Sequence, residues 1–385
     1  MSLWPVATAR GSDTVKHFTD ISHNWSHDYP YDPFLRGRFP VGVRTIQALD
    51  TVRDRLFPVE IWYPAAAQHA GQDIAPGTQD SFTVPSSDTR RSQMAVRNAA
   101  AEPGTYPLII FSHGSGYPAR LMATFLCTHL SSHGYVVAGL DHSELVAKEL
   151  ARKEDETAEQ KAARAEAWVA NRVPDIRFLL DHLLNGPAWD TEIKLDPTQI
   201  GIVGYSFGGW TALAAPEFDR RIRAVVALAP GGSSQPKPGI IPAQLTFNWD
   251  RDVPTLYLVA ENDCLTPLAG MYELFARTPA TKQMVILRRA DHIHFRDNVE
   301  QDHETVRTMA WPDELAWIAK EMRPIAELCS GQQAHLFVLG LTLCHLDAIL
   351  RRRQEAQQFS GSDIEAELAS RGIEAMVHKS ADYTD

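Results

Sequence analysis

The residues best suited to chemistry are Gly-Tyr-Ser-Phe-Gly at 204–208, a G-x-S-x-G motif. The motif lies between an apolar strand at 200–203 and a helical stretch that begins near Trp210. In so tight a turn the serine takes a strained backbone conformation, and glycines two residues before and after it relieve the crowding. The hydroxyl then projects above the sheet, where the N-terminus of the following helix favours developing negative charge. We therefore predict that Ser206 is a nucleophile.

A serine hydroxyl needs a base, and in this arrangement an acid and then a histidine follow the serine along the chain. The apolar strand at 255–260 leads into Glu-Asn-Asp-Cys-Leu-Thr-Pro, which places Asp263 at the carboxyl end of a strand. Parallel sheets build their sites at that edge. We predict that Asp263 holds the imidazole in the right tautomer. Glu261 and Asp252 are alternatives, and an aspartate that only shapes the turn is another.

Two histidines compete for the role of the base. The strand at 284–287 runs into Arg-Arg-Ala-Asp-His-Ile-His-Phe. We predict that His292, the first histidine after the strand, is the base, whereas His294 lines the pocket or caps the following turn. The pair could also form half of a metal site. No third ligand has suitable spacing, so we predict no metal and no cofactor.

A glycine-rich segment, Phe-Ser-His-Gly-Ser-Gly at 111–116, follows another apolar strand. Backbone amides of such a loop can approach a substrate carbonyl oxygen, and we predict the N–H groups of Ser115 and Phe207 as the oxyanion hole. His113 precedes the serine in the chain, so we interpret it as a residue that organises the loop. The dipeptide at 141–142, Asp-His, is interpreted as a satisfied structural pair.

Strands and helices alternate along the middle of the chain, which predicts a mostly parallel, doubly wound sheet in the α/β class. The predicted strands are at 56–63, 107–112, 135–140, 200–203, 224–228, 255–260 and 284–287. The predicted helices are at 119–132, 173–184, 210–215 and 268–276.

The remaining segments frame this core. We expect an irregular segment at 1–50, a core at 51–325, and a C-terminal helical extension at 326–385 that packs on the core. Within the core, residues 65–105 are rich in small and polar residues and indicate a long surface loop. Residues 144–172 are highly charged and indicate an exposed inserted helix, which would be either a lid or a solvated helix without a gating role.

Composition limits the classes of function. The 385 residues are 44% hydrophobic, enough for a sizeable core, and the net charge of −11 argues against a nucleic-acid partner. The four cysteines form no C-x-x-C pair, which indicates buried free thiols. The first residues lack the apolar core of a signal peptide, and no apolar run approaches the ~20 residues of a membrane-spanning helix. We expect a cytoplasmic protein without an integral membrane segment, either a monomer or a homodimer.

Several of these motifs together resemble one family. The segments Phe-Ser-His-Gly at 111–114, Leu-Ser-Ser-His-Gly-Tyr-Val-Val-Ala at 130–138 and Gly-Tyr-Ser-Phe-Gly-Gly at 204–209, with Phe295 three residues after His292, resemble platelet-activating factor acetylhydrolases and their bacterial dienelactone-hydrolase-like relatives. The resemblance spans roughly residues 56–350. It implies an α/β-hydrolase fold, no metal, and hydrolysis of esters with short acyl groups.

The chain departs from the animal acetylhydrolases in the position of the acid. There the acid follows the strand after the nucleophile helix, but here the strand at 224–228 runs into Ala-Pro-Gly. The position of Asp263 resembles dienelactone hydrolases and bacterial polyester hydrolases. The departure argues against a phospholipid substrate, but it leaves the expected mechanism unchanged.

The sequence predicts a serine hydrolase that cleaves a small-molecule carboxylic ester through an acyl-enzyme. A polyester, lactone, thioester or amide hydrolase with the same triad is the alternative. An inactive binding protein on a hydrolase scaffold belongs to another class. It would be favoured by loss of Ser206, Asp263 or His292, and all three are present.

Dialysis against a chelator should leave the esterase rate unchanged, because backbone amides and not a metal ion would stabilise the carbonyl oxygen. The rate of p-nitrophenyl ester hydrolysis before and after dialysis measures this. Loss of activity that zinc restores would point instead to a site among His113, His142, His292 and His294.

Overall fold

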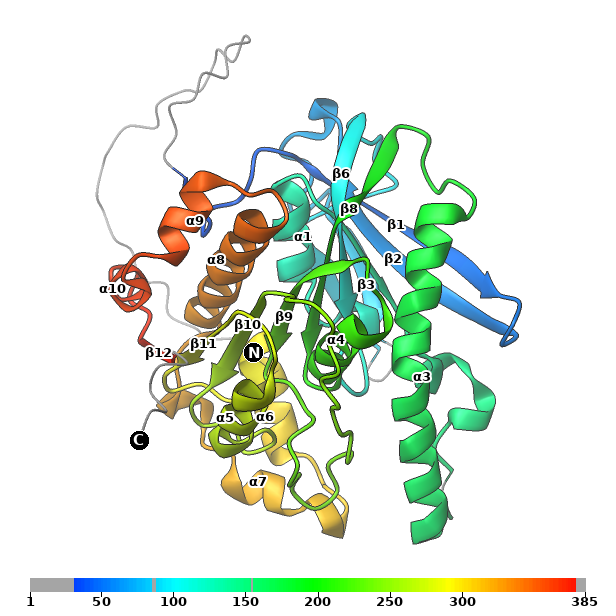
Figure 1. The fold of residues 1–385 in the computed structure, drawn as a ribbon, viewed down its shortest axis with the longest axis vertical. Helices are drawn as coiled ribbons and strands as arrows, with labels where there is room; N and C mark the ends of the chain where they lie inside the picture. Colours follow the sequence, from blue (N-terminus) through cyan, green and yellow to red (C-terminus); the bar gives the residue numbers. More distant parts are fainter. Residues whose placement is uncertain (1–30, 85–87, 154, 379–385) are drawn as a thin grey trace, which may run out of the picture. The chain divides into compact units, whose positions relative to one another are not determined.

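A central sheet organises the protein. The computed structural model describes residues 31–84, 88–153 and 155–378, so residues 1–30 of the predicted irregular segment lie outside the described residues. The strands of the sheet are β1 (Val41–Asp50), β2 (Arg55–Pro64), β5 (Val96–Arg97), β6 (Gly104–Ser112), β7 (Val136–Leu140), β8 (Ile193–Tyr205), β9 (Ile222–Leu228), β10 (Thr255–Ala260), β11 (Lys282–Leu287) and β12 (Ala375–His378). In the described residues their order is β12-β11-β10-β9-β8-β6-β7-β2-β1-β5 (Figure 1).

The middle of the sheet, from β7 to β11, is parallel, and antiparallel pairs occur toward its edges. Ser112 at the end of β6 is paired with Gly204 of β8, and Tyr205 is paired with Leu228 at the end of β9. The loops that follow these strands therefore leave the sheet side by side. The predicted mostly parallel, doubly wound architecture of an α/β-hydrolase is confirmed.

Helices cover both faces of the sheet (Figure 1). One buried cluster joins the sheet to α3 (Ala158–Asn185), α4 (Phe207–Phe218) and α5 (Leu268–Arg277). The other joins it to α1 (Thr124–Ser132), α8 (Gly331–Ile349) and α10 (Ile364–Ala369). Because both faces are covered, the central strands are buried apolar runs, and this is why they could be predicted from the sequence.

Two predictions for the N-terminal third need correction. Residues 41–50, within the predicted irregular segment, form β1, which pairs with β2 along its whole length. The predicted surface loop at 65–105 contains β3 (Asp80–Val84), β4 (Thr89–Gln93) and β5. Polar contacts stabilise this region: Gln93 accepts a hydrogen bond from Trp62 Nε1 at 2.6 Å and donates one to Asp80 at 2.7 Å. Short polar strands of this kind lack the apolar alternation that sequence patterns detect.

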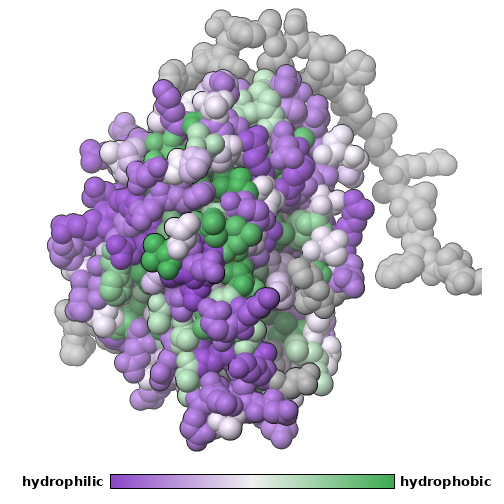
Figure 2. All heavy atoms as spheres, turned by 90° about the vertical axis from the view of Figure 1, so that its right-hand side faces the viewer, coloured by the Kyte–Doolittle hydropathy of each residue, from purple (hydrophilic) through white to green (hydrophobic). Residues whose placement is uncertain are grey.

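The inserted helix and the helix predicted at 173–184 are one element, the 28-residue α3. Thr157 and Gln160 form a capping box at its N-terminus, and Pro174 lies within it. Its first half is mostly exposed and charged, whereas its second half packs on the sheet. This change of environment along a single helix is why the composition indicated two elements. The face seen in Figure 2 is correspondingly mostly hydrophilic, with small hydrophobic areas near its centre.

The C-terminal region is more than a helical extension. Side chains of α8 are part of the buried cluster on one face of the sheet, and β12 adds an antiparallel edge strand beside β11. The remaining helices include α2 (Ser143–Val146), α6 (Val299–Thr308), α7 (Trp317–Glu321) and α9 (Gln354–Ser360). Within the described part of the chain, none of the helices has both the length and the apolar character needed to span a bilayer.

Candidate active site

Ser206 lies in the sharp turn between β8 and α4. Its backbone has φ 57° and ψ −117°, a strained conformation for a residue that is not glycine. A Cβ on Gly204 would lie 1.9 Å from the carbonyl oxygen of Gly208, and a Cβ on Gly208 would lie 1.9 Å from that of Ser112. Both positions therefore require glycine. The close packing of the turn against the end of β6 fixes the serine at the carboxyl edge of the sheet.

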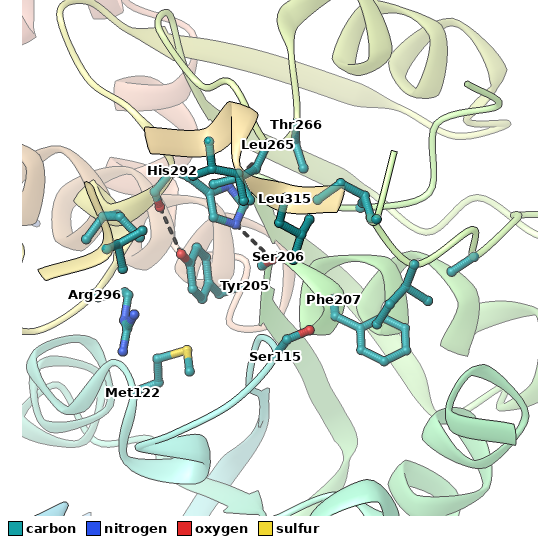
Figure 3. A pocket seen from close by; sticks show the side chains of 18 of the residues that line it. Ser115, Met122, Tyr205, Ser206, Phe207, Leu265, Thr266, His292, Arg296 and Leu315 are labelled. Carbon is teal, nitrogen blue, oxygen red and sulfur yellow. Dashed lines mark hydrogen bonds between the residues drawn. The ribbon is translucent and has the colours of Figure 1, made fainter. Parts of the chain in front are cut away.

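The structure brings Ser206, His292 and Asp263 together in one chain of hydrogen bonds. Ser206 Oγ lies 2.8 Å from His292 Nε2, and His292 Nδ1 lies 2.7 Å from Asp263 Oδ2 (Figure 3 shows the serine and the histidine). With Nδ1 protonated toward the carboxylate, Nε2 is free to accept the hydroxyl proton. The three residues follow β8, β11 and β10 respectively.

Asp263 is fixed by the turn that it begins. One carboxylate oxygen accepts hydrogen bonds from the N–H groups of Leu265 and Thr266, each at 2.8 Å, and the other accepts one from the Thr266 hydroxyl at 2.7 Å. The Asp263 carboxylate thus stabilises the turn and also contacts His292.

The alternative acids lie elsewhere. Glu261 accepts a hydrogen bond from the Arg289 N–H at 2.9 Å and forms an ion pair with Arg288 at 2.9 Å. Asp252 precedes β10 and accepts hydrogen bonds from Thr281. These contacts direct both carboxylates away from His292.

His294 is buried, and it is absent from the side chains that line the cavity beside Ser206. Its Nδ1 lies 2.9 Å from Asp291 Oδ1 and 3.1 Å from the Asp291 N–H, and its Nε2 lies 3.1 Å from the Cys329 carbonyl oxygen. A lone pair on Nδ1 would be repelled by the carboxylate, so we place a proton there. His294 thus contacts Asp291, the residue whose carboxylate caps the turn at 292–295 by accepting a hydrogen bond from the Ile293 N–H.

The environment of His294 favours its charged form. Burial alone would lower the pKa of His294, but the hydrogen bonds to Asp291 and Cys329 and the charge of Asp291 outweigh burial and raise the pKa to about 10. His303 Nε2 lies 2.6 Å from the other Asp291 oxygen. His294 therefore belongs to an interior ion pair, whereas His292 faces the serine.

The residues predicted for the oxyanion hole lie on the same cavity as Ser206. Ser115 is in the loop after β6, Phe207 is the first residue of α4, and both line the cavity (Figure 3). A Cβ on Gly114 would lie 3.2 Å from the Cβ of Ser206, so the glycine lets this loop approach the elbow closely.

The histidines that precede the elbow have structural contacts. His113 Nδ1 lies 2.6 Å from the Gly114 carbonyl, and its Nε2 accepts a hydrogen bond from the His142 N–H at 3.1 Å, so His113 organises its loop. His142 contacts Ser112 and Asp175, all fully buried, and Asp141 pairs with Arg120.

The cavity beside Ser206 has a volume of about 240 Å³. Its wall is mainly apolar and includes Ile240, Ile241, Leu265, Ile293, Val306, Trp311, Leu315 and Ile318. Much of this wall comes from two segments, 239–243 and 306–318, and Trp317 Nε1 donates to the Pro238 carbonyl at 3.1 Å where they meet. The predicted lid segment at 144–172 contributes Arg152 to the lining.

Sequence reasoning missed residues that hold the histidine. The buried Tyr205 hydroxyl donates to the His292 carbonyl at 2.9 Å, and its ring lies 5.1 Å from the imidazole. Thr266 contacts Asp263 as described. Tyr205 is a variable position of the motif, but Asp263 and Thr266 have the spacing typical of a side-chain cap and could have been recognised.

Among the residues that the structure describes, no group of three or more histidine, cysteine or acidic side chains is placed to hold a metal ion. The absence of a metal requirement stays a prediction.

The fold and the elbow define the class of the protein, an α/β-hydrolase. A family model described as platelet-activating factor acetylhydrolase, isoform II, matches residues 78–175. The acetylhydrolase of Cavia porcellus is 29% identical over 155 residues, which cover 32% of this chain and 35% of that protein. The chain thus matches about a third of that relative's length. Over these residues the chain is similar to platelet-activating factor acetylhydrolases, and its fold is that of an α/β-hydrolase.

Two further comparisons cover more of the chain. Cutinase est1 of Thermobifida alba is 23% identical over 237 residues, covering 61% of this chain and 68% of the cutinase. The solved structure of a ferulic acid esterase from Streptomyces cinnamoneus has a TM-score of 0.60 at 23% identity, covering 91% of this chain and 98% of the esterase. The structural likeness supports the fold.

We expect Asp263→Asn to lower kcat by about ten-thousandfold, because an amide would favour the wrong imidazole tautomer. Steady-state ester hydrolysis measures the effect. Glu261→Gln and Asp252→Asn are matched controls and should keep kcat within about threefold, since neither side chain reaches the histidine. Equal losses in Glu261→Gln would show that the acid has been assigned wrongly.

The His294 ion pair predicts a pH-dependent contribution to stability. The pKa of His294 is about 10 in the folded protein and 6.5 as its ordinary value, so the stabilisation is fully present below about pH 6.5 and is lost as pH rises through about 10. The Tm difference between wild type and His294→Gln should therefore be largest near pH 6 and shrink toward pH 10. A difference that is constant or grows with pH would contradict the charged assignment.

Proposed function

We propose that this protein is a serine hydrolase that cleaves carboxylic esters through an acyl-enzyme. The observation that carries the proposal is the continuous chain of hydrogen bonds from Ser206 through His292 to Asp263, beside an apolar cavity. The names of the similar proteins, an acetylhydrolase, a cutinase and a ferulic acid esterase, support the same class of reaction.

In the acylation step, Ser206 Oγ attacks the carbonyl carbon of the ester while His292 Nε2 removes the hydroxyl proton. The negative charge that develops on the carbonyl oxygen is stabilised by the N–H groups of Ser115 and Phe207. His292 then gives its proton to the leaving alcohol, and the C–O bond of the ester breaks.

In the deacylation step, His292 activates a water molecule that attacks the acyl-enzyme, and the acid is released as Ser206 regains its proton. Asp263 stabilises the imidazolium in both steps and keeps Nε2 directed at the serine. The three hydrogen bonds from Leu265 and Thr266 keep the carboxylate in place.

The substrate is a small-molecule ester with an apolar part that fits the wall formed by segments 239–243 and 306–318. A short acyl chain matches a cavity of about 240 Å³. A polyester is the second candidate substrate, favoured by the similarity to a cutinase over 61% of the chain. Lactones, thioesters and amides would use the same residues.

The four cysteines are buried thiols outside any disulfide, which favours a reducing compartment, and we propose that the protein is cytoplasmic. All proposed site residues come from one chain, so a homodimer is not needed for the chemistry.

The wild-type protein should hydrolyse p-nitrophenyl acetate, butyrate and hexanoate, with lower kcat/KM for the dodecanoate, whose chain exceeds the cavity. Ser206→Ala should lose at least about a thousandfold in kcat and keep its Tm. A phospholipid and a soluble polyester assayed beside these esters distinguish the substrate classes.

Labelling with a fluorophosphonate probe separates this protein from an inactive binding protein of the same fold. Wild type should be labelled and Ser206→Ala should not. Ser112→Ala is the matched control, because it removes the serine of the buried Ser112–His142–Asp175 set and leaves Ser206 in place. A folded wild-type protein that neither reacts with the probe nor hydrolyses any of these esters would contradict the proposed function.

A further inference from the structure

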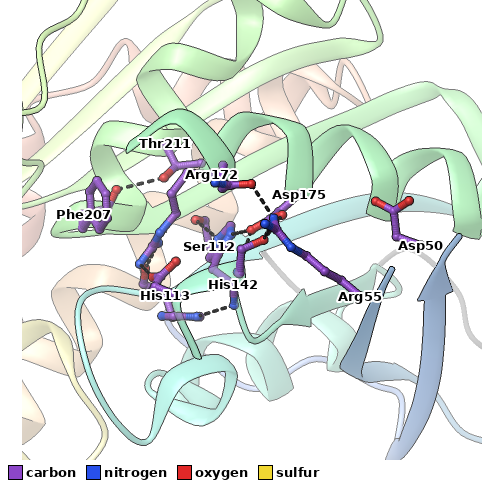
Figure 4. A network of polar contacts seen from close by, with 12 residues as sticks. Asp50, Arg55, Ser112, His113, His142, Arg172, Asp175, Phe207 and Thr211 are labelled. Atoms are coloured by element: carbon purple, nitrogen blue, oxygen red, sulfur yellow. Dashed lines mark hydrogen bonds and ion pairs between the residues drawn. The ribbon is translucent and has the colours of Figure 1, made fainter. Parts of the chain in front are cut away.

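Arg172 of α3 is a fully buried arginine beside the candidate site. Its Nη1 donates to the His113 carbonyl at 2.6 Å, its Nη2 donates to the Gly114 carbonyl at 3.4 Å, and it forms an ion pair with Glu144. Figure 4 shows its side chain extending from α3 toward His113. Burying a guanidinium costs free energy unless it is paired, so these contacts fix its position.

The two carbonyl groups belong to the loop that carries Ser115. The same loop is held by His113, whose Nδ1 lies 2.6 Å from the Gly114 carbonyl and whose Nε2 accepts from the His142 N–H. Burial first, and then the positive charge of Arg172, keep the pKa of His113 well below its ordinary value. The neutral ring can therefore accept that hydrogen bond.

The other side of Arg172 faces the second segment of the oxyanion hole. The guanidinium carbon lies 4.1 Å from the centre of the Phe207 ring, within the range of a cation–π contact. Phe207 follows Ser206 and is the second proposed donor. One side chain thus contacts both segments whose N–H groups must converge on a single oxygen atom.

The helix that carries Arg172 is itself anchored to the ends of β6 and β7. One turn further along α3, Asp175 accepts hydrogen bonds from the Ser143 N–H at 2.8 Å and from Arg53 at 2.7 Å. It also faces His142, whose Nε2 lies 2.9 Å from Ser112 Oγ. These contacts fix the turn of α3 that carries Arg172 against the ends of β6 and β7.

We propose that Arg172 is a positioning residue that sets the spacing between the Ser115 loop and Phe207 and so shapes the oxyanion hole. The proposal rests on the proposed esterase function. An oxyanion hole stabilises the transition state more than the bound ester, so the loss of correct spacing lowers kcat and leaves KM nearly unchanged.

Two variants test the proposal, Arg172→Lys and the double variant Arg172→Met with Glu144→Met, which leaves no buried carboxylate unpaired. In p-nitrophenyl butyrate hydrolysis each should lower kcat about 10- to 100-fold with KM within about threefold. The affinity for an aryl trifluoromethyl ketone, which forms a tetrahedral oxyanion with the serine, should weaken by a similar factor.

Arg351→Met is the matched control. Arg351 also donates to two consecutive backbone carbonyls, those of His133 and Gly134, and its guanidinium carbon lies 3.8 Å from the centre of the Tyr135 ring. These residues precede β7, at the edge of the sheet opposite the site. Arg351→Met should have a lower Tm than wild type and a kcat within about twofold of the wild-type value.

The proposal is overturned if either folded Arg172 variant keeps the kcat and the ketone affinity of wild type, or if the losses appear only in KM. It is also overturned if Arg351→Met loses kcat as much as the Arg172 variants, because the effect would then follow stability. An inactive wild-type protein would contradict the proposed function instead, so the two failures are distinguishable.

Discussion

The close packing of the elbow against its neighbouring strand ends is the constraint on which the site depends. Ser206 can hold its strained backbone only because Gly204 and Gly208 leave no Cβ between the elbow and the end of β6. Gly209 allows the same approach to Pro230 after β9, since a Cβ there would lie 2.8 Å from the Pro230 Cα. This packing also fixes where α4 begins. Phe207 therefore lies beside the Ser115 loop, and Ser206 lies opposite His292.

His292, His142 and His294 each contact a carboxylate in the interior, and their surroundings give them different roles. His292 lines the cavity and contacts Ser206, and Asp263 contacts the other ring nitrogen of His292. His142 and Asp175 contact Ser112 in a similar order, but all three are fully buried, so no ester can reach that serine. His294 has acceptors at both ring nitrogens and serves as an interior cation. Access to the cavity, and not the residue types, distinguishes a candidate triad from structural networks.

Sequence patterns were informative where a buried strand ends in a polar residue. The apolar runs before Ser206, Asp263 and His292 placed these residues at one edge of a parallel sheet, and the structure brings them within hydrogen-bond distance. Their catalytic roles stay proposals that the geometry supports. β1 and β3–β5 were missed because polar residues and turns conceal their alternation.

The role of Arg172 could not be predicted from the sequence. Its partners His113 and Glu144 lie 59 and 28 residues away along the chain. The charged first half of α3 also suggested a solvated helix, whereas Arg172 lies in the half that packs on the sheet. A buried charge is recognisable only once its distant partners are placed, because no local pattern marks it.

The central claim is that Ser206 becomes acylated, and trapping that intermediate tests it most directly. The protein is mixed with excess p-nitrophenyl butyrate, quenched in acid within the first turnovers, digested and analysed by mass spectrometry. We predict a butyryl group on the peptide that contains Ser206, and on that residue in the fragmentation spectrum. Ester turnover with an acyl group on another residue, or with no covalent adduct under conditions in which hydrolysis of the intermediate is slow, would contradict the account.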